Sequence, residues 1–197
     1  MYSKNSKNRD SVDCENNAEI LNLSLVQTAL ELFDLKDVKI TFKQCETTPF
    51  KTIQKSSLVK GDNQYEIYYP AGIAKNEIIT PIIHEIAHVY QLSRYGSYYE
   101  LKSSLTNLEI EILADFRAGY VYSKNLAPKQ LTAYASNLQL VGLYKENREE
   151  AHGCPEQRSA AFRSGAFYGN VEGETASFEE IKTWMLDNYG ESYECNF

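Results

Sequence analysis

The sequence lacks a long hydrophobic run and an excess of positive charge. No apolar stretch approaches the roughly 18 consecutive residues that a membrane-spanning helix needs. The 20 lysine and arginine residues are outnumbered by 27 aspartate and glutamate residues, which gives a net charge of −7. The chain therefore has no basic surplus with which to neutralise nucleic-acid phosphates or an anionic membrane. We expect neither nucleic acid nor a membrane span.

Cysteine is scarce, and its four occurrences form no close pair. Cys14, Cys45, Cys154 and Cys195 lie far apart, which excludes the C-x-x-C pattern of structural zinc clips and redox motifs. Two disulfides among them would suit an exported domain, whereas four free thiols would suit a cytoplasmic protein. We favour a periplasmic or secreted location, with an export segment absent from this sequence, and retain the cytoplasm as the alternative.

Length and composition predict one domain. A chain of 197 residues, of which 43% are hydrophobic, is long enough for one core and too short for two. Residues 1–17 are polar and rich in asparagine, serine and lysine, which is typical of a flexible segment. We therefore expect a flexible lead-in over 1–17 and a single domain over 18–197, with no internal repeat. The sequence does not predict the oligomeric state.

The first half of this domain is expected to hold a helix and a small sheet. Apolar residues recur at helical spacing from Ala18 to Asp34. Strands are predicted at 38–42, around 50–53 and at 64–69, where β-branched and aromatic residues gather. Pro70 ends the last strand or places it at a sheet edge. A free edge there could pair with an extended peptide. An ordinary sheet strand is the alternative.

The pattern H-E-x-x-H occurs once, with His84, Glu85 and His88 as its fixed residues. Residues four apart share a helix face, so the two histidines can bind one metal ion while Glu85 takes a proton from water. We expect this helix to begin with Thr80 as its N-cap and Pro81 as its first helical residue. The alternative is an ordinary amphipathic helix with two histidines whose hydrogen bonds are satisfied within the protein.

A second helix is expected to supply the third metal ligand. Thr106 and Glu109 have the spacing of a capping box, which predicts a helix start. Catalytic zinc usually takes three protein ligands and keeps one position open. Because Glu109 is used in the cap, we favour Glu111 as the ligand. Asp115, one turn later, is placed to hold the far nitrogen of a zinc-binding histidine.

Helices are expected to dominate the second half. Apolar spacing and a proline at a first helical position predict helices over 128–144 and 155–168. The last helix is expected to start at Ser177, which forms a capping box with Glu180, and to end near Gly190. The predicted class is α+β, with a small sheet on the N-terminal side packed on a mainly helical body that has the H-E-x-x-H helix at its centre.

Two residues near position 155 are candidates for stabilising charge on a substrate carbonyl oxygen. His152 is the only histidine outside the motif, and Arg158 lies within the expected helix. Each also has an ordinary interpretation, since Arg158 can pair with a buried carboxylate such as Asp115 and His152 can be a surface residue. We assign a catalytic role to His152 and a supporting role beside the ligands to Arg158 and Asp115.

These motifs resemble known zinc peptidases. H-E-x-x-H followed by E-x-x-A-D resembles the thermolysin-type enzymes, in which that glutamate is the third ligand. The segments HEIAHVYQ, EILADFRAGY and AHGCPEQRSAAFRSGAFYG are together similar to the bacterial neutral zinc metallopeptidase family, over roughly residues 78–169. The resemblance implies a zincin fold, one catalytic Zn²⁺ and peptide-bond hydrolysis. The chain departs from that family at Phe116, where members carry a cysteine, and in having no membrane-anchoring N-terminal segment.

We therefore expect a zinc-dependent endopeptidase with a peptide or protein substrate. Zn²⁺ would be held by His84, His88 and Glu111, and Glu85 would be the general base. One alternative is a zinc hydrolase of a non-peptide amide or ester. Another is a catalytically silent, metal-stabilised module that binds peptides. Glu85 favours an enzyme, because a structural metal needs no base.

Overall fold

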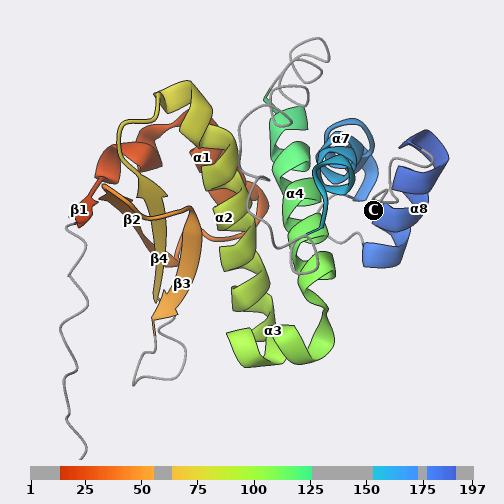
Figure 1. Ribbon diagram of the computed structural model, residues 1–197, viewed down its shortest axis with the longest axis horizontal. Helices are drawn as coiled ribbons and strands as arrows, with labels where there is room; N and C mark the ends of the chain where they lie inside the picture. Colours follow the sequence, from red (N-terminus) through yellow and green to blue (C-terminus); the bar gives the residue numbers. More distant parts are fainter. Residues whose placement is uncertain (1–13, 56–63, 126–152, 173–176, 190–197) are drawn as a thin grey trace, which may run out of the picture.

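The computed structural model describes residues 14–55, 64–125, 153–172 and 177–189, in which a small sheet packs beside a group of helices (Figure 1). The sheet has the strand order β1-β2-β4-β3. β2 and β4 are parallel, and the other neighbouring pairs are antiparallel. The predicted α+β class is confirmed. The strands are β1 (Cys14–Asn16), β2 (Lys39–Cys45), β3 (Lys51–Lys55) and β4 (Gln64–Pro70).

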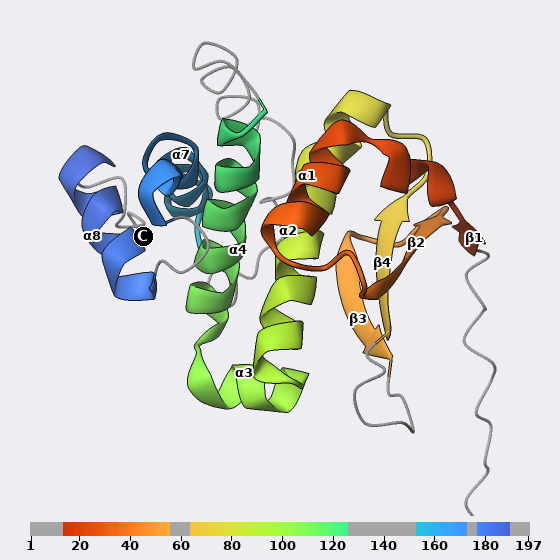
Figure 2. The ribbon, with the colours of Figure 1, turned by 180° about the vertical axis from the view of Figure 1, so that it is seen from behind.

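The helices form the larger part of the described chain. α2 lies between the sheet and α4, and α7 and α8 follow on the far side of α4 (Figure 1). α1 packs on α2 on the side that faces the viewer in Figure 2. After a 3₁₀ turn at Ala18–Asn22, the helices are α1 (Ser24–Leu32), α2 (Lys75–Tyr95), α3 (Tyr98–Ser104), α4 (Asn107–Ser123), α7 (Pro155–Glu172) and α8 (Phe178–Tyr189).

The strand positions match the sequence patterns, but the position of β4 within the sheet does not. Pro70 ends β4, where its missing N–H costs no ladder bond inside the sheet. β4 pairs with β2 on one side and with β3 on the other, so it is an interior strand. The expectation of a free peptide-binding edge on β4 is wrong. Alternating hydrophobicity fixes which side chains are buried but not which strands are neighbours, and β3 is the edge strand beside α2.

The described part of the chain begins inside the segment that the sequence predicts to be a flexible lead-in. Cys14–Asn16 forms β1, and a disulfide joins Cys14 to Cys45 at the end of β2. The side chain of Asn17 then accepts a hydrogen bond from the backbone N–H of Glu19 at the start of the 3₁₀ turn. Cys154 is also disulfide-bonded, and the described residues contain no free cysteine. The alternative of four free thiols is therefore wrong. Residues 1–13 lie outside the described ranges.

Helix α2 begins earlier than its sequence predicts. It starts at Lys75 and holds Pro81 in its interior, so the assignment of Thr80 as N-cap and Pro81 as first helical residue is wrong. Thr80 and Ile78 are buried, and the Thr80 hydroxyl hydrogen-bonds to the hydroxyl of Tyr122 on α4. Burial of these early turns outweighs the one backbone hydrogen bond that a proline removes from a helix interior.

Both predicted capping boxes are present. In the first, the N–H of Thr106 donates to Glu109 Oε2 at 2.6 Å, and the N–H of Glu109 donates back to Thr106 Oγ1 at 3.3 Å. In the second, Ser177 and Glu180 make the same pair of bonds at 2.7 and 3.3 Å. α4 and α8 therefore start where the sequence predicts. The helix expected over 128–144 lies outside the described residues.

Helices α4 and α7 cross at two glycines. A Cβ atom placed on Gly119 would lie 1.9 Å from the carbonyl oxygen of Phe162, and one on Gly165 would lie 1.8 Å from the carbonyl oxygen of Phe116. The backbones of the two helices are therefore in contact at this point. A buried apolar cluster fills the space between α4, α7 and α8, and it includes Ile112, Leu113, Phe116, Ala161, Ile181 and Met185.

Gly119→Ala is expected to destabilise the protein. In an ordinary helix interior this substitution stabilises by roughly 0.5–1 kcal/mol, because glycine loses more backbone freedom on folding. Here the added methyl group collides with the carbonyl of Phe162, and the overpacking costs about 1–3 kcal/mol or more. Equilibrium denaturant unfolding measures the change. A stability equal to or above that of the wild type would contradict the close crossing.

Candidate metal centre

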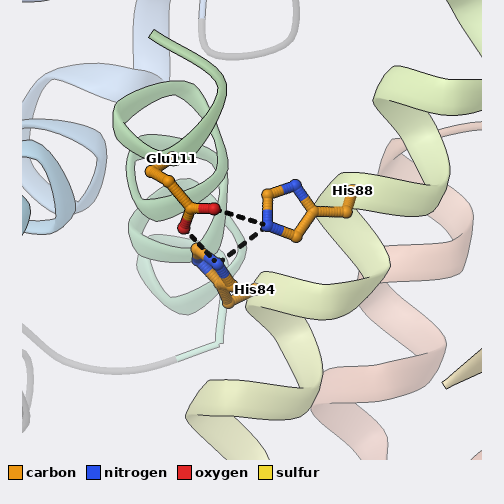
Figure 3. A group of neighbouring side chains, drawn as sticks. All are labelled: His84, His88 and Glu111. Carbon is orange, nitrogen blue, oxygen red and sulfur yellow. Dashed lines mark hydrogen bonds and ion pairs between the residues drawn. The ribbon is translucent and has the colours of Figure 1, made fainter. Parts of the chain in front are cut away.

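His84 and His88 on α2 and Glu111 on α4 point toward one another between the two helices (Figure 3). The Nε2 atoms of the histidines are 3.0 Å apart. Glu111 Oε2 lies 3.2 Å from Nε2 of His84, and Glu111 Oε1 lies 3.6 Å from Nε2 of His88. The three side chains are 12–14% exposed, so the group is largely but not fully enclosed.

This triangle of donor atoms fits a tetrahedral metal ion. Ligand atoms that lie about 2.0–2.1 Å from a tetrahedral zinc ion are separated from one another by roughly 3.3–3.4 Å. The two imidazole nitrogens are 3.0 Å apart, and they lie 3.2 and 3.6 Å from the two different oxygens of the Glu111 carboxylate, so the separations bracket that value. Two imidazole nitrogens and one carboxylate oxygen also form a donor set that catalytic zinc uses. The three residues can therefore hold a metal ion.

The local structure explains why Glu111, rather than Glu109, reaches the histidines. The carboxylate of Glu109 is bonded to the backbone of Thr106 in the capping box. Glu111 lies two residues further on, about 200° around the helix, where α4 faces α2. The capping box thus sets the start of α4 and, with it, the direction in which Glu111 points.

Asp115 lies beside His84, as the sequence predicts. Its Oδ1 is 2.8 Å from Nδ1 of His84, which leaves Nε2 of that ring directed at Glu111. Arg158 on α7 holds the same carboxylate, with Nε 2.6 Å from Oδ2 and Nη2 3.1 Å from Oδ1. The Asp115 carboxylate therefore contacts both His84 and Arg158. Because Arg158 holds this carboxylate in place, the carboxylate can fix the orientation of the His84 ring.

Arg158 also contacts the ligand set itself. Its Nη2 lies 3.2 Å from Oε2 of Glu111. The guanidinium therefore bridges Glu111 and Asp115, which lie one helical turn apart on α4. The crossing of α4 and α7 at Gly119 and Gly165 is what brings this side chain within reach of both carboxylates.

The charged neighbours control the ionisation of His84. Burial lowers the pKa of this histidine, but the carboxylates of Asp115 and Glu111 outweigh burial and raise the pKa to about 10. Burial raises the pKa of Asp115, and the charges of Arg158 and His84 outweigh that effect and hold it below its usual value. Without a metal ion, the site therefore favours a protonated His84, and a metal ion that binds there must displace that proton.

His88 has a partner that the sequence did not suggest. Its Nδ1 lies 2.8 Å from Oε1 of Gln91, and Nε2 of Gln91 donates a hydrogen bond of 2.8 Å to the carbonyl oxygen of Ile110. Gln91 is 2% exposed. The available signal was its position three residues after His88, a spacing at which helical side chains meet.

Glu85 is buried and contacts the edge strand β3. The Thr52 hydroxyl oxygen lies 2.7 Å from Oε2 of Glu85 and 2.9 Å from its backbone carbonyl oxygen. Two residues along the strand, Nε2 of Gln54 donates a hydrogen bond of 2.9 Å to the carbonyl oxygen of Gly96, which caps α2. Side chains two apart on a strand share a face, so one face of β3 is fastened to α2 at two points.

His152, the remaining candidate from the sequence, lies outside the described residues. Within those residues, no helix is long and apolar enough to cross a membrane. Comparisons of the chain with protein-family models, with curated proteins and with solved structures find no match. The resemblance to zinc peptidases therefore rests on the sequence motifs.

Glu111→Ala is expected to abolish stoichiometric zinc binding, because it removes one of three protein donors. Glu109→Ala is the matched control on the same helix, and it should retain the metal while losing about 0.5–2 kcal/mol of stability with the cap. Elemental analysis of protein dialysed against Zn²⁺ measures the first effect, and denaturant unfolding measures the second. Metal lost in Glu109→Ala and kept in Glu111→Ala would overturn the ligand assignment.

Proposed function

We propose that this chain is a zinc-dependent endopeptidase of the zincin type. The observation that carries the proposal is the composition of α2, which contributes two metal-binding histidines and, next to the first of them, a buried glutamate bonded to a sheet edge. A structural metal site requires only the ligands. A glutamate held beside them adds the proton acceptor that hydrolysis needs.

The metal and Glu85 have separate tasks. Zn²⁺ held by His84, His88 and Glu111 would supply Lewis-acid polarisation of the scissile carbonyl and acidify water. Glu85 accepts a proton from the attacking water and returns a proton to the leaving amine. The Thr52 hydroxyl contacts Oε2 of Glu85, which fixes the carboxylate while its other oxygen remains an acceptor.

A peptide substrate is favoured over a small amide or ester by the position of β3. Among the described strands, β3 pairs only with β4, so its other backbone edge has no partner strand in that part of the chain. An extended peptide can add to such an edge through main-chain hydrogen bonds. Thr52 and Gln54 fasten the strand to α2, and this would hold the added peptide in a fixed position relative to the metal ligands.

The motifs support the same assignment. The order H-E-x-x-H, E-x-x-A-D and H-G-x-x-x-Q-R is that of the bacterial neutral zinc metallopeptidases, and we propose that the chain is a relative of that family. The disulfide between Cys14 and Cys45 supports a location outside the cytoplasm, where disulfides persist.

Glu85→Gln is expected to lower turnover of any cleavable peptide by roughly 100-fold to 10,000-fold, because the amide cannot accept the proton. Zinc content and melting temperature should remain close to wild type, since the substitution keeps the size of the side chain. Glu77→Gln, at an exposed position on the same helix, is the matched control and should leave turnover unchanged. Cleavage of a broad peptide library, quantified by mass spectrometry, is the measurement.

The same experiment separates the alternatives. Wild-type cleavage of small amide or ester substrates without any peptide cleavage would favour the non-peptide hydrolase. Peptide binding without cleavage by a zinc-loaded wild type would favour the binding module. A zinc-loaded Glu85→Gln protein with wild-type turnover would refute the proposed mechanism.

A further inference from the structure

We propose that Gln91 is a positioning residue that fixes the tautomer of His88 and thereby directs its Nε2 lone pair at the metal. The inference rests on the proposed metal site but not on peptidase activity. The side-chain bonds of Gln91 go to Nδ1 of His88 and to the carbonyl oxygen of Ile110. Gln91 acts through the far side of the imidazole ring.

The chemistry of the Ile110 carbonyl sets the orientation of the Gln91 amide. A carbonyl oxygen can only accept, so the atom of Gln91 that lies 2.8 Å from it must be the amide nitrogen. The amide oxygen then faces Nδ1 of His88 at 2.8 Å. Because that oxygen can only accept, Nδ1 must carry the proton.

A neutral imidazole that carries its proton on Nδ1 has its lone pair on Nε2. Nε2 of His88 is the atom that lies 3.0 Å from Nε2 of His84 and 3.6 Å from Glu111. The hydrogen bond of Gln91 therefore prepares the nitrogen that faces the other two ligands. In the opposite tautomer a proton would occupy the position of the metal.

Burial prevents the amide from turning over. Gln91 is 2% exposed, and a flipped amide would place its oxygen against the carbonyl oxygen of Ile110. Buried polar groups without partners are costly, and two opposed acceptors are worse. The orientation is thus fixed by a backbone atom of α4, one residue before the third ligand Glu111. The two histidines are held differently, because Asp115 gives His84 a charged partner and Gln91 gives His88 a neutral one.

A purely structural role would make Gln91 only a tie between α2 and α4. The chain offers a matched control for that possibility, because Thr80 also joins α2 to α4 through a buried hydrogen bond, to Tyr122. Thr80→Val removes such a tie without touching a histidine partner. Gln91→Met removes both bonds of Gln91 at similar length. Gln91→Glu keeps an acceptor for His88 but sets its second oxygen against the carbonyl oxygen of Ile110, so it should lower the melting temperature while it keeps the tautomer.

The test measures the tautomer of His88 by long-range ¹H–¹⁵N NMR without metal, zinc affinity by chelator competition, and melting temperature. We expect an Nδ1-protonated His88 in the wild type and in Gln91→Glu, and a tautomer mixture in Gln91→Met. Zinc affinity should fall about 10-fold to 100-fold in Gln91→Met and remain within about 3-fold of wild type in Gln91→Glu. Thr80→Val should lower the melting temperature and leave the tautomer of His88 and the zinc affinity unchanged.

An Nε2-protonated His88 in the wild type would overturn the inference. An unchanged tautomer in Gln91→Met, or a loss of zinc affinity no larger than in Thr80→Val, would do the same. If Gln91→Met does not fold, the wild-type tautomer and the Gln91→Glu readouts decide. A wild type that binds zinc but cleaves no peptide would refute the endopeptidase and leave the role of Gln91 standing. A wild type that binds no zinc would overturn the inference too, because the inference rests on the metal site.

Discussion

The packing of α4 against α2 is the constraint on which the rest of the site depends. Two of the possible metal ligands lie four residues apart on one helix, but the third comes from a second helix, so its position depends on how the two helices pack. Several interactions join that second helix to α2 along its length. They include the buried bond of Gln91 to the carbonyl of Ile110, the contact of Asp115 with His84, and the bond between Thr80 and Tyr122. α7 adds support from behind, through a crossing so close that only glycine fits at positions 119 and 165.

Local features of the site follow from the sequence because their causes are local. The four-residue spacing of His84 and His88 determines that they share a helix face. The capping box of Thr106 and Glu109 determines both the start of α4 and, by using Glu109, the choice of Glu111. The strand β4 also follows from its own residues, and its buried side chains alternate along the strand. In each case the residues that decide the structure lie within one or two turns of one another.

The features that the sequence did not reveal depend on contacts between distant segments. Pro81 looked like a helix start, but burial of Ile78 and Thr80 against the rest of the fold extends α2 past it. Strand order is set by which edges meet, so β3 rather than β4 became the edge strand. The partners of Glu85 and His88 were missed for related reasons. Thr52 comes from a strand 33 residues earlier, and Gln91 acquires its role only because α4 supplies a carbonyl to orient it.

The charged groups around His84 connect the possible metal site to α7. The carboxylates of Glu111 and Asp115 lie within 3.2 Å of the nitrogens of this ring, and the side chains of all three residues are largely buried. Arg158 contacts both carboxylates, so one guanidinium is shared between two acids. Without a metal ion, the two acids favour a proton on His84, although burial opposes it. A metal ion at Nε2 of His84 would take the place of that proton beside the same two acids. The buried carboxylates and the three possible ligands therefore have one explanation, a site built to hold a positive charge.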